Sequence, residues 1–115
     1  MPYADHRPDY NGKNADAQNV YLRAYHCSEL PFIFNNIEYS AQATGTTPDA
    51  NALADKMSQA WINFARIDDP IASGLPYWPE FTKEGGATMI FDNHSEVRMH
   101  HDDELMKLLA PEYEF

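Results

Sequence analysis

An apolar stripe between Pro48 and Arg66 constrains the fold of this chain more than any other feature of the sequence. Four apolar side chains recur at steps of four, four and three residues, and so share one helical face: Leu53, Met57, Trp61 and Phe64. Pro48 suits a first helical turn, Thr47 or Asp49 can cap it, and residues 68–70 (Asp-Asp-Pro) end the pattern. The spacing predicts a helix over 48–66 that packs this face into a core, which we favour over a cofactor-binding face.

The segments before this helix carry weaker patterns. Residues 1–18 are polar and rich in turn formers, which predicts a loop or a flexible arm. Residues 19–25 contain enough β-formers to predict a strand. A short helical or irregular turn is expected over 29–35, and a second flexible stretch of small polar residues over 40–47.

After the helix, a proline-rich loop leads to a turn at Gly85-Gly86 and a predicted strand over 87–92. A final helix is expected from Asp102 to Leu109, because acidic residues fill its first turn, where the helix dipole favours negative charge. Two strands and two to three helices in this order indicate an α/β fold class, as the C-terminal fragment of an α/β sheet that is incomplete as a fold.

Size and charge limit the number of domains and the partners that this chain can have. At 115 residues the chain is one domain at most, spanning 1–115, and its net charge is −10 with only 8 Lys and Arg. Binding to nucleic acid or to an anionic membrane surface needs clustered basic residues, so neither partner is expected. No apolar run reaches the length of a membrane span, and residues 1–7 lack a signal-peptide core, so the cytoplasm is slightly favoured as the location.

A histidine follows the predicted strand directly, in the segment Arg23-Ala24-Tyr25-His26-Cys27-Ser28-Glu29-Leu30-Pro31-Phe32-Ile33-Phe34. This segment resembles the catalytic-histidine segment of the type-B carboxylesterase and cholinesterase family of α/β-hydrolases, whose pattern is Gly-Ala-x-His-Gly-x-Glu-Leu-Pro-aromatic-x-Phe. Seven positions match it: Ala24, His26, Glu29, Leu30, Pro31, Phe32 and Phe34. Arg23 and Cys27 replace its two glycines, residues that often supply backbone room or a positive φ.

Three later segments extend the resemblance in the family's order. Residues 61–70 are similar to its Trp-x-Asn-Phe-Ala-Lys-x-Gly-Asp-Pro helix end, with Asp68 where glycine is usual. Residues 74–81 are similar to its Leu-Pro-x-Trp-Pro-x-Tyr/Phe loop, and residues 88–92 to its closing strand. The four segments together cover roughly residues 20 to 109 and make the resemblance specific.

The resemblance implies a role for His26 in a Ser, Asp or Glu, His triad. A serine hydroxyl needs a base whose pKa lies near neutrality, and imidazole is that side chain. An α/β-hydrolase carries its serine on an upstream Gly-x-Ser-x-Gly turn, which this sequence does not contain. Glu29 would belong to the polar surroundings of the triad and not be its acid; a solvated or helix-capping carboxylate is the alternative.

The sequence contains two other candidate sites. His94, His100, His101, Asp102, Asp103 and Glu104 could offer metal ligands, but they lack a recognised ligand spacing, and an exposed acidic helix start is favoured. Cys27, the only cysteine, could be a reactive thiol beside His26, although a small packed residue at a tight position is favoured. No metal and no cofactor are expected.

Two functions are therefore expected from the sequence. In the first, the chain is the C-terminal segment of a serine carboxylesterase that supplies His26 to ester hydrolysis through an acyl-enzyme and is inactive alone. In that case a small ester is a substrate only when the missing part, which carries the nucleophile, is present. In the second, a non-catalytic, truncated or standalone relative acts through self-association or a partner chain. Either a homo-oligomer or a complex with the rest of an esterase is expected, because an incomplete sheet exposes strand edges.

Overall fold

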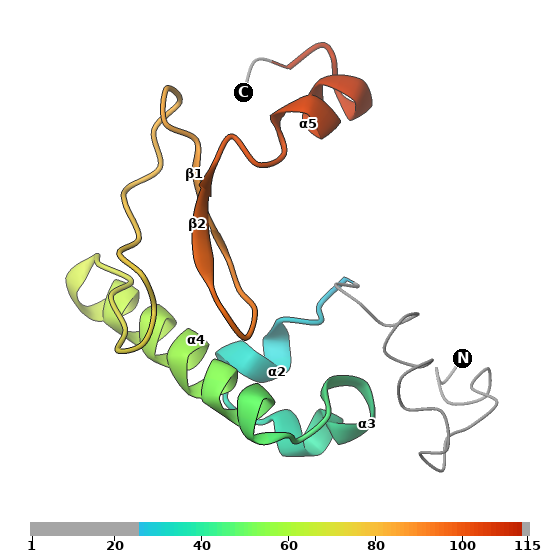
Figure 1. Cartoon of the computed structure of the whole chain (residues 1–115), viewed down its shortest axis with the longest axis vertical. Coiled ribbons are helices and arrows are strands. Elements are labelled where there is room, and N and C mark those ends of the chain that lie inside the picture. Colours follow the sequence, from blue (N-terminus) through green and yellow to red (C-terminus); the bar gives the residue numbers. More distant parts are fainter. Residues whose placement is uncertain (1–25, 114–115) are drawn as a thin grey trace, which may run out of the picture. The chain divides into compact units, whose positions relative to one another are not determined.

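The computed structural model describes residues 26–113; for residues 42 and 43 it describes the backbone alone (Figure 1). The predicted arm over 1–18 and the predicted strand over 19–25 lie outside these residues. The chain divides into two compact units, Met1–Asp55 and Lys56–Phe115, and the division falls inside the long helix α4.

Three short helices precede α4 in the first unit: α2 (Leu30–Ile33), the 3-10 helix η2 (Ile37–Ser40) and α3 (Ala41–Thr44). Of the two forms predicted for the turn over 29–35, helical or irregular, the structure shows the helical one, α2. The flexible stretch predicted over 40–47 is wrong, because η2 and α3 occupy much of it and α3 ends only at Gly45, whose φ is 70°. Buried side chains of this unit include Ile37 and Ala54.

Helix α4 spans Pro48–Ile67, as the apolar stripe predicts. The Thr47 hydroxyl accepts a hydrogen bond from the Ala50 amide at 3.2 Å, so Thr47 caps the helix while Asp49 lies in its first turn. Asp68 ends it with φ 57° and donates its amide hydrogen to the Phe64 carbonyl oxygen at 2.9 Å.

The core face predicted for α4 is only partly correct. Met57 and Ala60 are buried in the second unit, but 41% of Trp61 and 56% of Phe64 stay exposed. Among the described residues, no large side chain is fully enclosed. The periodicity therefore found the apolar face correctly, but within residues 26–113 its C-terminal half is only partly covered.

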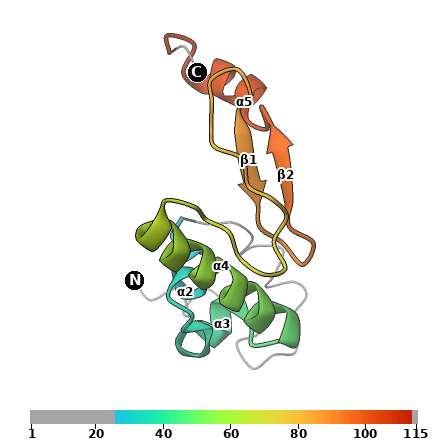
Figure 2. The same ribbon diagram turned by 90° about the vertical axis from the view of Figure 1, so that its left-hand side faces the viewer.

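Two strands form an antiparallel hairpin in the second unit: β1 (Ala87–Ile90) and β2 (Glu96–Met99) (Figures 1 and 2). The register pairs Ala87 with Met99 and Ile90 with Glu96. Alternate β1 residues, Ala87 and Met89, are buried, as expected for a strand with one inward face. The strand predicted over 87–92 is confirmed but ends two residues earlier, and β2 was not predicted.

Helix α5 (Asp103–Leu109) follows β2 and confirms the predicted last helix. It has no buried residue, and its leucines Leu105, Leu108 and Leu109 are exposed. Within residues 26–113, none of the helices combines the length and the apolar character that a membrane span requires.

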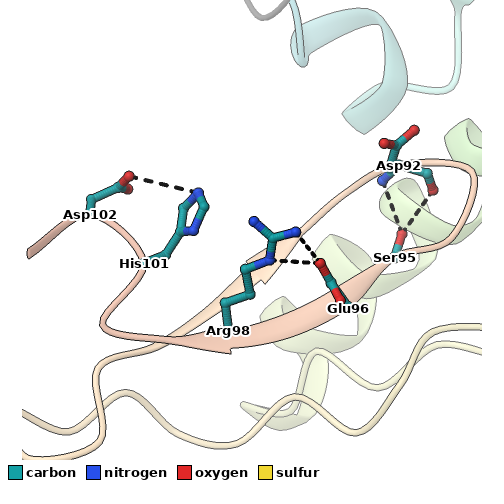
Figure 3. Close-up of polar contacts among 6 residues, drawn as sticks. All are labelled: Asp92, Ser95, Glu96, Arg98, His101 and Asp102. Atoms are coloured by element: carbon teal, nitrogen blue, oxygen red, sulfur yellow. Dashed lines mark hydrogen bonds and ion pairs between the residues drawn. The ribbon is translucent and has the colours of Figure 1, made fainter. Parts of the chain in front are cut away.

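Polar contacts order the hairpin and the segment after it (Figure 3). At the tip, Ser95 Oγ donates to the Asp92 carbonyl oxygen at 3.1 Å, and the Asp92 amide donates to Ser95 Oγ at 3.3 Å. On β2, Arg98 Nε donates to Glu96 Oε1 at 2.6 Å. Such exposed pairs set local geometry and contribute little stability.

Candidate active site

His26 opens the described part of the chain, in a turn that leads into α2. Its side chain is exposed, and no hydrogen bond or ion pair joins it to a serine or a carboxylate among residues 26–113. An exposed imidazole can accept and return a proton. The described residues therefore contain the candidate base without an ordered nucleophile or acid beside it.

The backbone of this turn bends at Cys27, whose φ of 67° lies in the left-handed region. The Leu30 amide donates to the Cys27 carbonyl oxygen at 3.3 Å and closes the turn. Cys27 is free and exposed, so the expectation of a small packed side chain is wrong; backbone conformation, and not packing, distinguishes the position. Glycine adopts this φ without a Cβ clash, which is the reason that a glycine suits the position in the family pattern.

Glu29 lies three residues after His26, at the start of α2. Its backbone oxygen accepts hydrogen bonds from the amides of Phe32 and Ile33, each at 3.0 Å. Its side chain is exposed and makes no capping hydrogen bond, which excludes the capping alternative in this structure. The structure thus places His26 and Glu29 in one turn, with no bond between their side chains.

The histidines and acids near α5 do not gather into a metal site. In the described part of the chain, no group of three or more His, Cys, Asp or Glu side chains is placed to hold an ion. His100 is instead held by two neighbours: Nε2 lies 2.7 Å from the Glu84 carbonyl oxygen and Nδ1 lies 2.9 Å from Asp103 Oδ2. His101 lies 3.8 Å from Asp102 (Figure 3).

Sequence reasoning missed this bridging role of His100. Gly86 lies against the imidazole so closely that a Cβ there would come within 2.7 Å of Nδ1. The His100 amide also donates to the Gly86 carbonyl oxygen at 3.0 Å. The Gly85-Gly86 pair before a strand was the available signal, since a glycine there can mark close approach of another group.

Comparison with known proteins identifies the family. Residues 3–108 match the Carboxylesterase family. The chain belongs to this family. The resemblance inferred from the His26 segment and the three later segments is therefore confirmed.

Characterised carboxylesterases are similar to this chain over only part of their length. Phenmedipham hydrolase of Pseudarthrobacter oxydans is 37% identical over 81 residues, which are 66% of this chain and 16% of that protein. Para-nitrobenzyl esterase of Bacillus subtilis (strain 168) is 34% identical over 90 residues, which are 76% of this chain and 18% of that protein. The chain thus spans less than a fifth of either relative.

Solved esterase structures show the same relation. An esterase from anaerobic Clostridium hathewayi, described as able to hydrolyse aliphatic aromatic polyesters, matches with a TM-score of 0.67 and 41% identity. The match covers 74% of this chain and 17% of that esterase. The hairpin and helices described above are therefore a small part of an α/β-hydrolase fold.

Proposed function

We propose that this chain supplies the general base of a serine carboxylesterase and is catalytically complete only together with the part that carries the nucleophile and the acid. The observation that supports this most is His26 itself: it stands at the histidine of the family pattern, within the segment that matches the family. The left-handed backbone at Cys27 supports it further, because the turn keeps a conformation that the glycine of the pattern can adopt.

In the proposed reaction, His26 takes the proton from a serine hydroxyl as the serine oxygen attacks the carbonyl carbon of an ester. The imidazolium then returns the proton to the departing alcohol, which leaves an acyl-enzyme. A water molecule, deprotonated by the same imidazole, releases the carboxylic acid and restores the serine. In this proposal Glu29 contributes negative charge near the imidazolium without taking its proton, because it is exposed and three residues away.

Complementation tests the proposal. The full chain is combined with the portion of para-nitrobenzyl esterase that lies outside the matched region, and hydrolysis of a para-nitrobenzyl ester is followed. We expect activity with the wild-type chain, with Cys27→Ala and, reduced, with Glu29→Gln. His26→Ala should lose at least 10³-fold, since triad members act as a unit.

Activity that persists in the His26→Ala mixture would contradict the proposal. Complex formation without any activity, for wild type and variants alike, would favour the non-catalytic alternative.

A further inference from the structure

An open groove of about 860 Å³ runs between α4 and the loop that follows it, within the second unit. Aromatic side chains dominate its lining: Trp61, Phe64, Tyr77, Trp78 and Phe81. Acidic residues border it at the end of the helix and in the loop, namely Asp68, Asp69 and Glu80. We call this surface the aromatic groove.

The walls of the aromatic groove are held by contacts within the unit. Trp61 packs against Trp78 and Phe91 with ring centroids 6.2 and 5.9 Å apart, and Trp78 meets Phe91 edge-on at 5.6 Å. Asn63 Nδ2 donates to the Ile71 carbonyl oxygen at 2.6 Å, which ties the loop to α4. The groove is therefore formed before anything occupies it, so an occupant meets a preorganised surface.

The groove exposes more aromatic surface than a protein usually leaves in water. Tyr77 is 81% exposed and Phe81 66%, beside the half-exposed Phe64 and Trp61. Contiguous apolar surface of this kind marks a place where another surface binds. Aromatic side chains are also the residues most enriched at binding hot spots.

Charge distinguishes between the possible occupants. Three carboxylates border the groove and the chain as a whole carries −10, so a second copy would bring acidic borders together. A partner surface that complements the groove is apolar at its centre and carries Lys or Arg where it meets Asp68, Asp69 and Glu80. The share of the relatives that this chain covers, 16% and 18%, leaves most of a carboxylesterase domain to supply such a surface.

We propose that the aromatic groove is the docking surface for the remaining portion of a carboxylesterase domain, the portion that relatives have outside the matched region. This inference rests on the proposed function and adds the surface by which the two parts join. The groove centre supplies apolar burial, and the acidic border selects a basic rim on the partner.

Light scattering and binding titration of the full chain test this inference, with the same portion of para-nitrobenzyl esterase as the probe. The groove variant is Tyr77→Ser. Tyr39→Ser is its matched control, because Tyr39 is equally exposed, at 81%, but lies in the first unit. We expect a one-to-one complex for wild type and Tyr39→Ser and at least tenfold weaker binding for Tyr77→Ser. Circular dichroism checks that both variants keep the wild-type helix content.

Each other outcome overturns the inference. If Tyr77→Ser bound the probe as tightly as Tyr39→Ser, and the double variant Tyr77→Ser with Phe64→Ser did so too, the docking surface would not be the groove. A 26 kDa dimer of the chain, twice its 13.1 kDa, that Tyr77→Ser dissociates would assign the groove to a second copy. No complex with the probe would reject this occupant.

The variant His26→Ala distinguishes a failure of the docking proposal from a failure of the proposed function. His26→Ala should bind the probe as tightly as wild type, because His26 is not a groove residue, while giving an inactive complex. An active His26→Ala complex would reject the proposed function and leave the docking surface standing.

Discussion

Cys27 and Asp68 share one backbone conformation, with φ of 67° and 57°, although neither is a glycine. Both stand where the carboxylesterase pattern has glycine, at the turn after His26 and at the end of α4. The left-handed region brings the Cβ of an L-residue close to backbone oxygen, and aspartate tolerates it better than cysteine does. The chain therefore keeps two glycine-type turns at a cost in backbone strain.

Replacing Cys27 by glycine should stabilise the chain. We expect Cys27→Gly to raise the free energy of unfolding by about 1 kcal/mol, because relief of the positive φ outweighs the added freedom of the unfolded chain. Asp68→Gly should gain less, since aspartate already tolerates this conformation. Urea denaturation followed by circular dichroism measures both changes.

Ser28→Gly is the control, because Ser28 lies next to Cys27 and its φ is not positive. This variant should be destabilised by several tenths of a kcal/mol through chain entropy. If Cys27→Gly lost as much stability as Ser28→Gly, strain at Cys27 would be the wrong explanation of its conformation.

Local signals predicted the elements that depend on local chemistry. Helix α4 was predicted to within one residue because its apolar period, its Thr47 cap and its stop at Asp68 all act within the segment. The last helix and β1 were also predicted, because the acidic first turn of the helix and the β-forming residues of the strand are local signals too. The family was recognised because the residues around His26 match its pattern, a source of information that composition and periodicity do not contain, and the catalytic role of His26 stays a prediction.

Elements that depend on a partner segment could not be predicted. The four residues of β2, Glu96–Met99, form a strand because they pair with β1 across the turn at Asp92 and Ser95, and their own charged sequence gives little sign of it. Burial on α4 was misjudged for the same reason. Periodicity shows that Phe64 lies on the apolar face, but it cannot show what covers that face.

Ala60 should tolerate no larger side chain, because it is fully buried on α4 within the second unit. We expect Ala60→Leu to lower the free energy of unfolding by about 1–3 kcal/mol through overpacking. Ala65→Leu on the same helix is the matched control; it is exposed and should change stability by less than about 0.5 kcal/mol. Similar denaturation midpoints for the two variants would show that the packing around Ala60 is loose.

The chain by itself should not hydrolyse esters. Among residues 26–113, His26 is the exposed candidate base, with no serine or carboxylate bonded to it, and a base without its nucleophile retains little of the rate. An activated short-chain aryl ester incubated with the purified chain should turn over no faster than with free imidazole at the same concentration. Faster turnover that His26→Ala abolishes would mean that the chain carries a nucleophile of its own.

Gly86 and His100 should be coupled, because the glycine leaves the space that the imidazole fills. Gly86→Ala adds a Cβ 2.7 Å from Nδ1 at a residue whose φ is +57°, so we expect a loss of more than about 1 kcal/mol of stability. His100→Ala loses the contacts to Glu84 and Asp103. The double variant should lose less than the sum of the two single losses, since removing the ring relieves the clash and leaves only the cost of the positive φ. A double-mutant cycle of urea midpoints measures the difference, and strict additivity would show that the imidazole moves away without cost.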